Sequence, residues 1–137
     1  MSERKRVLIV DDDPDFAAAI KAILDSRYDT DVTHDPKAGW EALQKSRYDL
    51  LCLDIMMGRG AEGVAMARRI RKDKVLREMP VLIITGLREQ IAFLFPGQAV
   101  HPGFVAVDEL VEKPVEPDLL LQRAAALIAA NEARRGH

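Results

Sequence analysis

The chain has 137 residues, of which 48% are apolar and 31% charged, a composition typical of a soluble globular domain and not of a disordered or fibrous chain. Its formal net charge of −2 provides no overall positive field, so we expect no direct nucleic-acid partner. The single cysteine, Cys52, lies in an apolar run, and the polar amino terminus leads into an apolar run of only four residues, 7–10. These features indicate a cytoplasmic protein without a disulfide, a signal peptide or a membrane span.

Short apolar runs alternate with longer amphipathic stretches along the chain. Runs such as 7–10 and 50–53 lack polar alternation, which is typical of strands buried on both faces of a parallel sheet. The run 31–34 is a weaker strand signal. The predicted strands, in chain order, are residues 7–10, 31–34, 50–53, 81–84 and 109–112.

Helices are predicted between these strands from capping residues, prolines and apolar spacing. Asp13 and Asp35 are candidate N-caps, and each precedes a proline at the first helical position. Trp40 lies in the second helix, where we expect it to be core or partly buried cover. The predicted helices are 14 to about 26, one that starts at 36, 64–73, a short one at 88–95, and one from 117, after which residues 131–137 are expected to fray.

Five buried strands that alternate with helices predict an α/β fold. We expect a single doubly wound, five-stranded parallel sheet with helices on both faces, joined by right-handed crossovers. Residues 95–107 contain two Pro-Gly pairs and break the pattern, so an irregular extended segment is expected between the fourth and fifth strands. We expect one domain over residues 1–137, with its core at about 5–130 and no output domain.

Reactive residue types stand where the predicted strands end. Asp11 and Asp12 follow the first strand, Asp54 the third, Thr85 the fourth and Lys113 the fifth. Ligands of such sheets bind beyond the carboxyl ends of the strands. Each residue alone has an ordinary explanation, such as helix capping, but their joint placement at one edge favours a site.

The chemistry of these residue types indicates phosphoryl transfer. Three carboxylates at one edge repel each other, and Mg²⁺ suits an all-oxygen site in which the ion keeps several waters. A carboxylate beside the metal can accept a phosphoryl group, because aspartate forms covalent phosphate intermediates and the metal offsets negative charge. The hydroxyl of Thr85 and the ammonium of Lys113 would face the other phosphoryl oxygens.

Four stretches, in this order, resemble the receiver domain of response regulators, within the CheY-like superfamily. They are 7–14 (VLIVDDDP), 53–57 (LDIMM), 80–86 (PVLIITG) and 112–114 (EKP), and the resemblance covers nearly the whole chain. It implies a flavodoxin-like fold with strand order 2-1-3-4-5 and Asp54 as the phosphoacceptor. It also implies that Asp12 binds Mg²⁺ directly, that Asp11 binds largely through water, and that the backbone carbonyl of Met56 completes the protein ligands.

By the same resemblance, Thr85 and Lys113 are the switch hydroxyl and the phosphate-binding lysine. The implied function is a phosphorylation-dependent switch of a two-component system or phosphorelay, and not a turnover enzyme. The implied donor is a sensor histidine kinase, a phosphotransfer protein or a small phosphodonor, and the signal passes to an unidentified downstream protein. A homodimer through the face from the fourth strand to the last helix is an arrangement that the resemblance allows.

Some positions depart from the family pattern and leave a first alternative open. Gly58 replaces the usual proline in a loop that is one residue longer, and Leu110 replaces the usual aromatic switch residue. The interval from Thr85 to Lys113 is several residues longer than usual. The alternative is a receiver-like interaction module that works without phosphorylation.

A second alternative is a phosphohydrolase that uses an aspartyl phosphate. Such enzymes generally need an acid/base carboxylate beside the nucleophile, and Ile55-Met56 after Asp54 offers none.

In receiver domains, side chains two residues beyond the phosphoacceptor and the switch hydroxyl can reach the attacking water. Here these residues, Met56 and Leu87, are both apolar, which favours slow self-dephosphorylation. Three histidines lack the spacing of a transition-metal site. They are His34, His101 and His137.

Overall fold

The computed structural model describes residues 4–54, 61–85 and 109–135. Within these ranges, the strands form one parallel sheet, and its order β2-β1-β3-β4-β5 confirms the predicted fold class. The strands are β1 (Arg6–Val10), β2 (Asp29–Thr33), β3 (Leu50–Asp54), β4 (Val81–Thr85) and β5 (Glu109–Glu112). The helices are α1 (Pro14–Leu24), α2 (Pro36–Lys45), α3 (Ala61–Lys72) and α5 (Pro117–Arg135).

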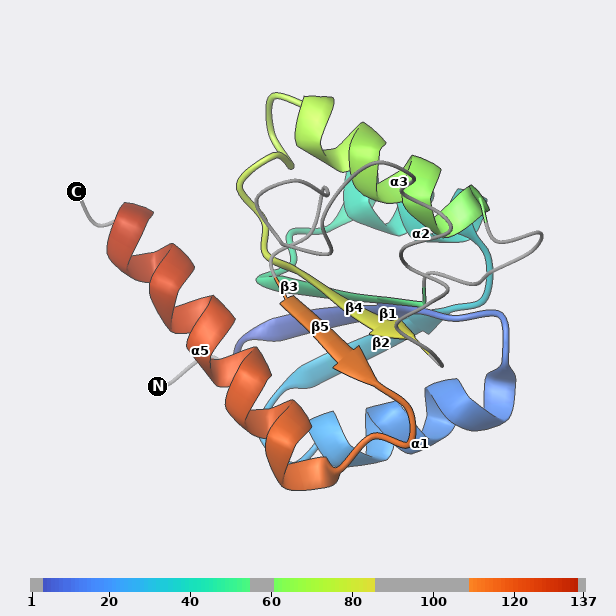
Figure 1. Ribbon diagram of the computed structural model, residues 1–137. Helices are drawn as coiled ribbons and strands as arrows, with labels where there is room; N and C mark the ends of the chain where they lie inside the picture. Colours follow the sequence, from blue (N-terminus) through green and yellow to red (C-terminus); the bar gives the residue numbers. More distant parts are fainter. Residues whose placement is uncertain (1–3, 55–60, 86–108, 136–137) are drawn as a thin grey trace, which may run out of the picture.

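The helices cover the sheet in two layers. Helices α1 and α5 lie on one face and α2 and α3 on the other (Figure 1). All five residues of β3 are buried, as are all five of β4, because both faces of these central strands are covered. Successive β3 residues alternate between the layers: Leu51 and Leu53 pack with α2 and α3, and Leu50 and Cys52 pack with α1 and α5.

The two predicted N-caps are confirmed. The Asp13 carboxylate accepts hydrogen bonds from the backbone N–H groups of Asp15, at 3.0 Å, and Phe16, at 3.2 Å. The Asp35 carboxylate accepts one from the N–H of Ala38, at 2.7 Å. A side-chain cap of this kind stabilises a helix by about 1 kcal/mol, and Asp13 fixes the start of α1 directly after the end of β1.

The strand register brings the carboxyl ends of four strands to nearly the same level. Val10 pairs with Leu53, so Asp11 and Asp54 are the next residues on neighbouring strands. Residue Thr85, which ends β4, lies one position beyond the partner of Asp54. Because Thr85 pairs with Glu112, the next residue on the β5 side is Lys113.

Two element boundaries differ from the sequence-based expectation. Helix α3 begins at Ala61 and not at 64, so Gly63, which precedes the predicted start, is buried in its first turn. The expected fraying from 131 is wrong up to Arg135, because α5 continues through this segment. The side chain of Asn131 is buried there, and Glu132 forms an ion pair with Lys5 at 2.8 Å.

Other expectations about single residues hold. Trp40 is partly buried against the α2 and α3 layer, and Leu110 also packs there. The thiol of Cys52 is fully buried, and burial raises its pKa to about 12, as expected for a core cysteine. No helix in the described part of the chain is long and apolar enough to cross a membrane. The expected helix at 88–95 and the irregular segment at 95–107 lie outside the described residues.

Candidate functional site

The candidate site lies at the carboxyl edge of the sheet, the edge at which its strands end. Strands β1 and β3 are neighbours there, although the chain visits β2 between them, so this is where the strand order reverses. Residue Asp11 follows β1, and its N–H donates to the carbonyl oxygen of Thr33 at 3.1 Å. Residue Asp54 is the last residue of β3. The two carboxylates therefore flank the expected ligand position.

Three carboxylates gather at this edge. One oxygen from each of Asp11, Asp12 and Asp54 lies within 4.8 Å of the other two. Residue Asp11 is 2% exposed and Asp54 is 5% exposed, whereas Asp12 is exposed to solvent. The sequence-based prediction that these residues meet at one edge is confirmed. Two buried like charges beside a third make this a region of strong negative potential.

The environment of Asp11 opposes its ionisation. Burial is the main cause and the charge of Asp54 contributes, so that the pKa of Asp11 is raised from 3.8 to about 6. The N–H of Asp13, which donates to the Asp11 carboxylate at 2.9 Å, and the charge of Lys113 act in the opposite direction. A cation bound at this edge would offset the repulsion between the carboxylates of Asp11 and Asp54.

The predicted lysine and threonine also lie at this edge. The Nζ atom of Lys113 is 3.9 Å from Oδ2 of Asp54, and the lysine side chain is 29% exposed. The backbone N–H of Lys113 donates to the carbonyl oxygen of Thr85 at 2.7 Å, which ties the end of β5 to the end of β4. Thr85 is fully buried. The ammonium of Lys113 thus lies beside the carboxylate cluster.

Two residues of this region were missed as parts of the site. The ring of Phe16 lies under the ammonium of Lys113, with 4.0 Å from Nζ to the ring centroid. The Nδ1 atom of His34 is 3.0 Å from the backbone carbonyl oxygen of Asp11, so the imidazole donates and supports the turn after β1. In the sequence, Phe16 is one apolar residue of the predicted helix that starts at 14, and His34 is an isolated histidine. Neither pattern carries information on a contact with a residue so far along the chain.

The carboxylate set suits a hard divalent cation. Mg²⁺ binds oxygen ligands at roughly 2.1 Å, so two oxygens on one ion are at most about 4.2 Å apart. Carboxylate oxygens that lie within 4.8 Å of one another therefore fit one ion after a small closure, or with a water between the ion and one carboxylate. Backbone ligation by Met56 cannot be placed, because this residue lies outside the described residues, as do Leu87 and His101.

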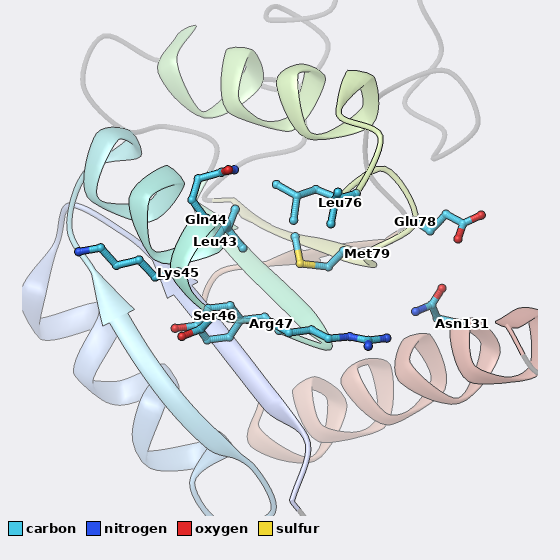
Figure 2. Close-up of a pocket in the computed structure, with 11 residues that line it drawn as sticks. Leu43, Gln44, Lys45, Ser46, Arg47, Leu76, Glu78, Met79 and Asn131 are labelled. Atoms are coloured by element: carbon cyan, nitrogen blue, oxygen red, sulfur yellow. The ribbon is translucent and has the colours of Figure 1, made fainter.

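A separate hollow of about 470 Å³ lies at the opposite edge of the sheet. Its lining comes from the end of α2 and the segment after it, from residues 75–79, and from Asn131 on α5. Figure 2 shows Leu43, Leu76 and Met79 packed together in this region, with Arg47 extending toward α5. None of the predicted site residues lines this hollow, so it is distinct from the carboxylate cluster.

Comparison with known proteins gives consistent results. The family model of the response regulator receiver domain matches residues 7–125. The transcriptional regulatory protein DltR of Streptococcus agalactiae serotype III (strain NEM316) is 31% identical over 139 residues. That match covers 96% of this chain and 58% of DltR, so the chain spans little more than half of the length of this relative.

Solved structures agree on the fold. A sensor protein from Polaromonas sp. JS666 superposes with a TM-score of 0.81 at 25% identity, over 93% of this chain and 98% of that one. A CheY-like receiver domain protein from Methanospirillum hungatei JF-1 gives a TM-score of 0.80 at 24% identity, over 96% and 99% of the two chains. With the family match over residues 7–125, these results show that the chain belongs to the response regulator receiver domain family of two-component systems, whose members are signalling domains and not classical enzymes.

Proposed function

We propose that residues 1–137 form a single receiver domain that accepts a phosphoryl group on Asp54 in a Mg²⁺-dependent reaction. The observation that carries the proposal is the surroundings of the Asp54 carboxylate. It has two further carboxylates within 4.8 Å and the ammonium of Lys113 at 3.9 Å. A buried carboxylate between metal-ligand groups and a fixed cation is suited to attack an electrophilic phosphorus atom.

The reaction is an in-line displacement at phosphorus. An Asp54 oxygen forms the new P–O bond, while the bond from phosphorus to the leaving group breaks. The leaving group is a histidine nitrogen of a sensor kinase or phosphotransfer protein, or an oxygen of a small phosphodonor, and it keeps the bonding electron pair. The histidine nitrogen takes up a proton, whereas a carboxylate such as the acetate of acetyl phosphate leaves as an anion. When bound, Mg²⁺ supplies the positive charge that offsets the transferring group and the carboxylates.

The other residues at this edge have separate roles in the proposal. Asp12 would hold the ion directly, and Asp11 would hold it largely through a water. Met56 supplies a backbone carbonyl. The ammonium of Lys113 pairs with one phosphoryl oxygen as a point charge, and the hydroxyl of Thr85 donates to another.

The signal leaves through a protein contact or a further phosphotransfer. New contacts from the phosphoryl group to Thr85 and Lys113 bias a two-state element at the ends of β4 and β5. Only the difference in contact energy between the two states can shift that equilibrium. The downstream partner is a protein that reads the shifted face, and a homodimer through the face from β4 to α5 is one form that the output can take.

The first experiment measures intact-protein mass after incubation with acetyl phosphate, with and without Mg²⁺. We expect wild-type protein to gain one phosphoryl group only with Mg²⁺, and Asp54→Asn to gain none. A matched control is Asp29→Asn, which makes the same change at an exposed carboxylate on β2 and should gain the group as the wild type does.

Two results would contradict the proposal. If folded wild-type protein gained no phosphoryl group under any condition, the receiver-like interaction module that works without phosphorylation would replace it. If Asp54→Asn still gained one group, the acceptor would be another residue, and peptide mapping of the modified protein would identify it.

A further inference from the structure

The ammonium of Lys113 has two neighbours of different kinds. Its Nζ atom lies 3.9 Å from the Oδ2 atom of Asp54 and 4.0 Å from the centroid of the Phe16 ring. Hydrogen bonds from an ammonium to a carboxylate are usually about 2.7–2.9 Å long. At 3.9 Å the contact with Asp54 is an ion pair without a short hydrogen bond. The carboxylate therefore does not by itself determine where the ammonium sits.

The aromatic ring supplies attraction of a kind that suits this place. The face of a phenyl ring is electrically negative, and it attracts a cation within about 6 Å of its centroid, more strongly where water is partly excluded. The Lys113 side chain is 29% exposed, so it is partly desolvated. A ring has no oxygen that could compete with a phosphoryl group for the donors of the ammonium. It can hold the cation in place and leave its N–H groups available.

Both partners are anchored by their backbones. The N–H of Phe16 donates to the capping carboxylate of Asp13 at 3.2 Å, and its ring packs against the layer formed with α1 and α5. The N–H of Lys113 donates to the carbonyl oxygen of Thr85 at 2.7 Å. The long, flexible lysine side chain would otherwise lose much rotamer freedom on reaching the site. A fixed ring lowers that loss during the reaction, because the cation is already in place.

We propose that Phe16 is a positioning residue for phosphoryl transfer, whose ring holds the ammonium of Lys113 beside Asp54 and ready for the incoming phosphoryl oxygens. The inference rests on the proposed function. It adds a residue of α1 to a site otherwise built from residues at the ends of strands and the loops that follow them. Phe16 acts only through Lys113 and does not itself touch the reacting atoms.

The test combines a measurement of contact with a measurement of rate. In unphosphorylated protein, NMR should place the ε-methylene protons of Lys113 upfield, because they lie in the shielding region of a ring face. Phe16→Leu should remove that shift, and Phe16→Tyr should keep it. With acetyl phosphate and Mg²⁺, Phe16→Leu should lower the rate of Asp54 phosphorylation by about threefold to tenfold, while Phe16→Tyr stays within about twofold of the wild type.

A matched variant separates positioning from packing. Ile23 lies near the other end of α1 and, like Phe16, is partly buried against the same layer. Ile23→Val removes apolar volume there without touching Lys113, and it should leave the phosphorylation rate unchanged. Equal losses in Phe16→Leu and Phe16→Tyr, or in Ile23→Val, would overturn the inference in favour of a packing role.

The NMR measurement keeps this inference distinct from the proposed function. An absence of the upfield shift in wild-type protein would overturn the positioning role, even if Asp54 is phosphorylated normally. If the shift is present and depends on Phe16, but the phosphorylation rate of Phe16→Leu equals that of the wild type, the contact exists without positioning and the inference is also overturned. Failure of wild-type protein to accept any phosphoryl group would instead reject the proposed function.

Discussion

At the amino edge of the sheet, where the strands begin, cations and carboxylates meet in pairs. Lys5 reaches Glu132 at 2.8 Å, and Arg6 reaches Asp31 at 3.0 Å. The side chains of these pairs are about half exposed, between 40% and 53%. At the carboxyl edge, three carboxylates gather beside the ammonium of Lys113, and two of the three are almost fully buried.

The difference shows what each edge is suited to do. Exposed, paired charges contribute little to stability because water already solvates them and salt screens them. Buried carboxylates that lie close together repel each other and destabilise the fold until a proton or a cation compensates them. The carboxyl edge therefore carries an electrostatic cost that binding can relieve. Variants that remove the ammonium of Lys113, the charge of Asp11 or the close packing around Gly39 test this comparison in turn.

Loss of the lysine at the carboxyl edge should have the largest effect. Lys113→Met keeps the apolar stem but removes the charge that faces the transferring group, so we expect the rate of Asp54 phosphorylation by acetyl phosphate to fall about 100-fold or more. The control, Lys5→Met, removes a paired cation at the amino edge and should leave this rate unchanged. Similar rates for both variants and the wild type would mean that Lys113 does not assist the transfer.

The buried carboxylate should make stability depend on pH. The pKa of Asp11 is about 6 in the folded state against its usual 3.8, so between these values the folded state binds more protons than the unfolded state. Without divalent ions, the free energy of unfolding should therefore fall as the pH rises from about 4 to about 6, by at most about 3 kcal/mol, and stay lowered above pH 6. Urea unfolding at several pH values, in EDTA, measures this decline.

Two comparisons make the pH experiment specific. Asp11→Asn cannot ionise and should lose most of the decline, while Asp29→Asn at the amino edge should keep it. Saturating Mg²⁺ should restore stability above pH 6, because the ion binds ionised carboxylates of the folded state. If Asp11→Asn shows the same pH dependence as the wild type, Asp11 is not the source of the decline.

The two edges also differ in how far the sequence predicts them. The meeting of Asp11, Asp12 and Asp54 could be predicted, because buried parallel strands bring their carboxyl ends to one edge regardless of detailed packing. The strand order was implied by the resemblance to receiver domains and is confirmed. The contact between Phe16 and Lys113 could not. It depends on where the start of α1 lies relative to the end of β5, and no local pattern encodes that distance.

The extent of α5 was underestimated for a similar reason. Local sequence around Asn131 is polar and suggests fraying, since it offers no apolar stripe. In the folded chain, Asn131 is buried and Glu132 pairs with Lys5 from the other end of the chain. Likewise, Gly63 lies just before the predicted helix 64–73, but in the folded chain it is buried in the first turn of α3. Tertiary contacts outweigh local preference at both positions.

A packing change should have the smallest effect and should separate stability from electrostatics at the carboxyl edge. A Cβ atom at Gly39 of α2 would lie 2.9 Å from Cγ2 of Val10, 3.0 Å from Cε of Met66 and 3.2 Å from Oγ1 of Thr33. Gly39→Ala should therefore destabilise the protein by about 1–2 kcal/mol, because overpacking exceeds the usual helical gain of alanine over glycine. Denaturant unfolding measures the loss, and Asp54 phosphorylation should stay within about twofold of the wild-type rate.

A matched pair at an exposed position of the same helix fixes the sign of this effect. At Glu41, the alanine variant should be more stable than the glycine variant by about 1 kcal/mol, the intrinsic preference of a helix interior. Alanine should thus give the more stable protein at position 41, and glycine should give the more stable protein at position 39. If Gly39→Ala instead stabilised the protein as much as alanine does at 41, Val10 and Met66 would have room to move. The close approach of α2 to β1 would then not constrain Val10, the residue before Asp11.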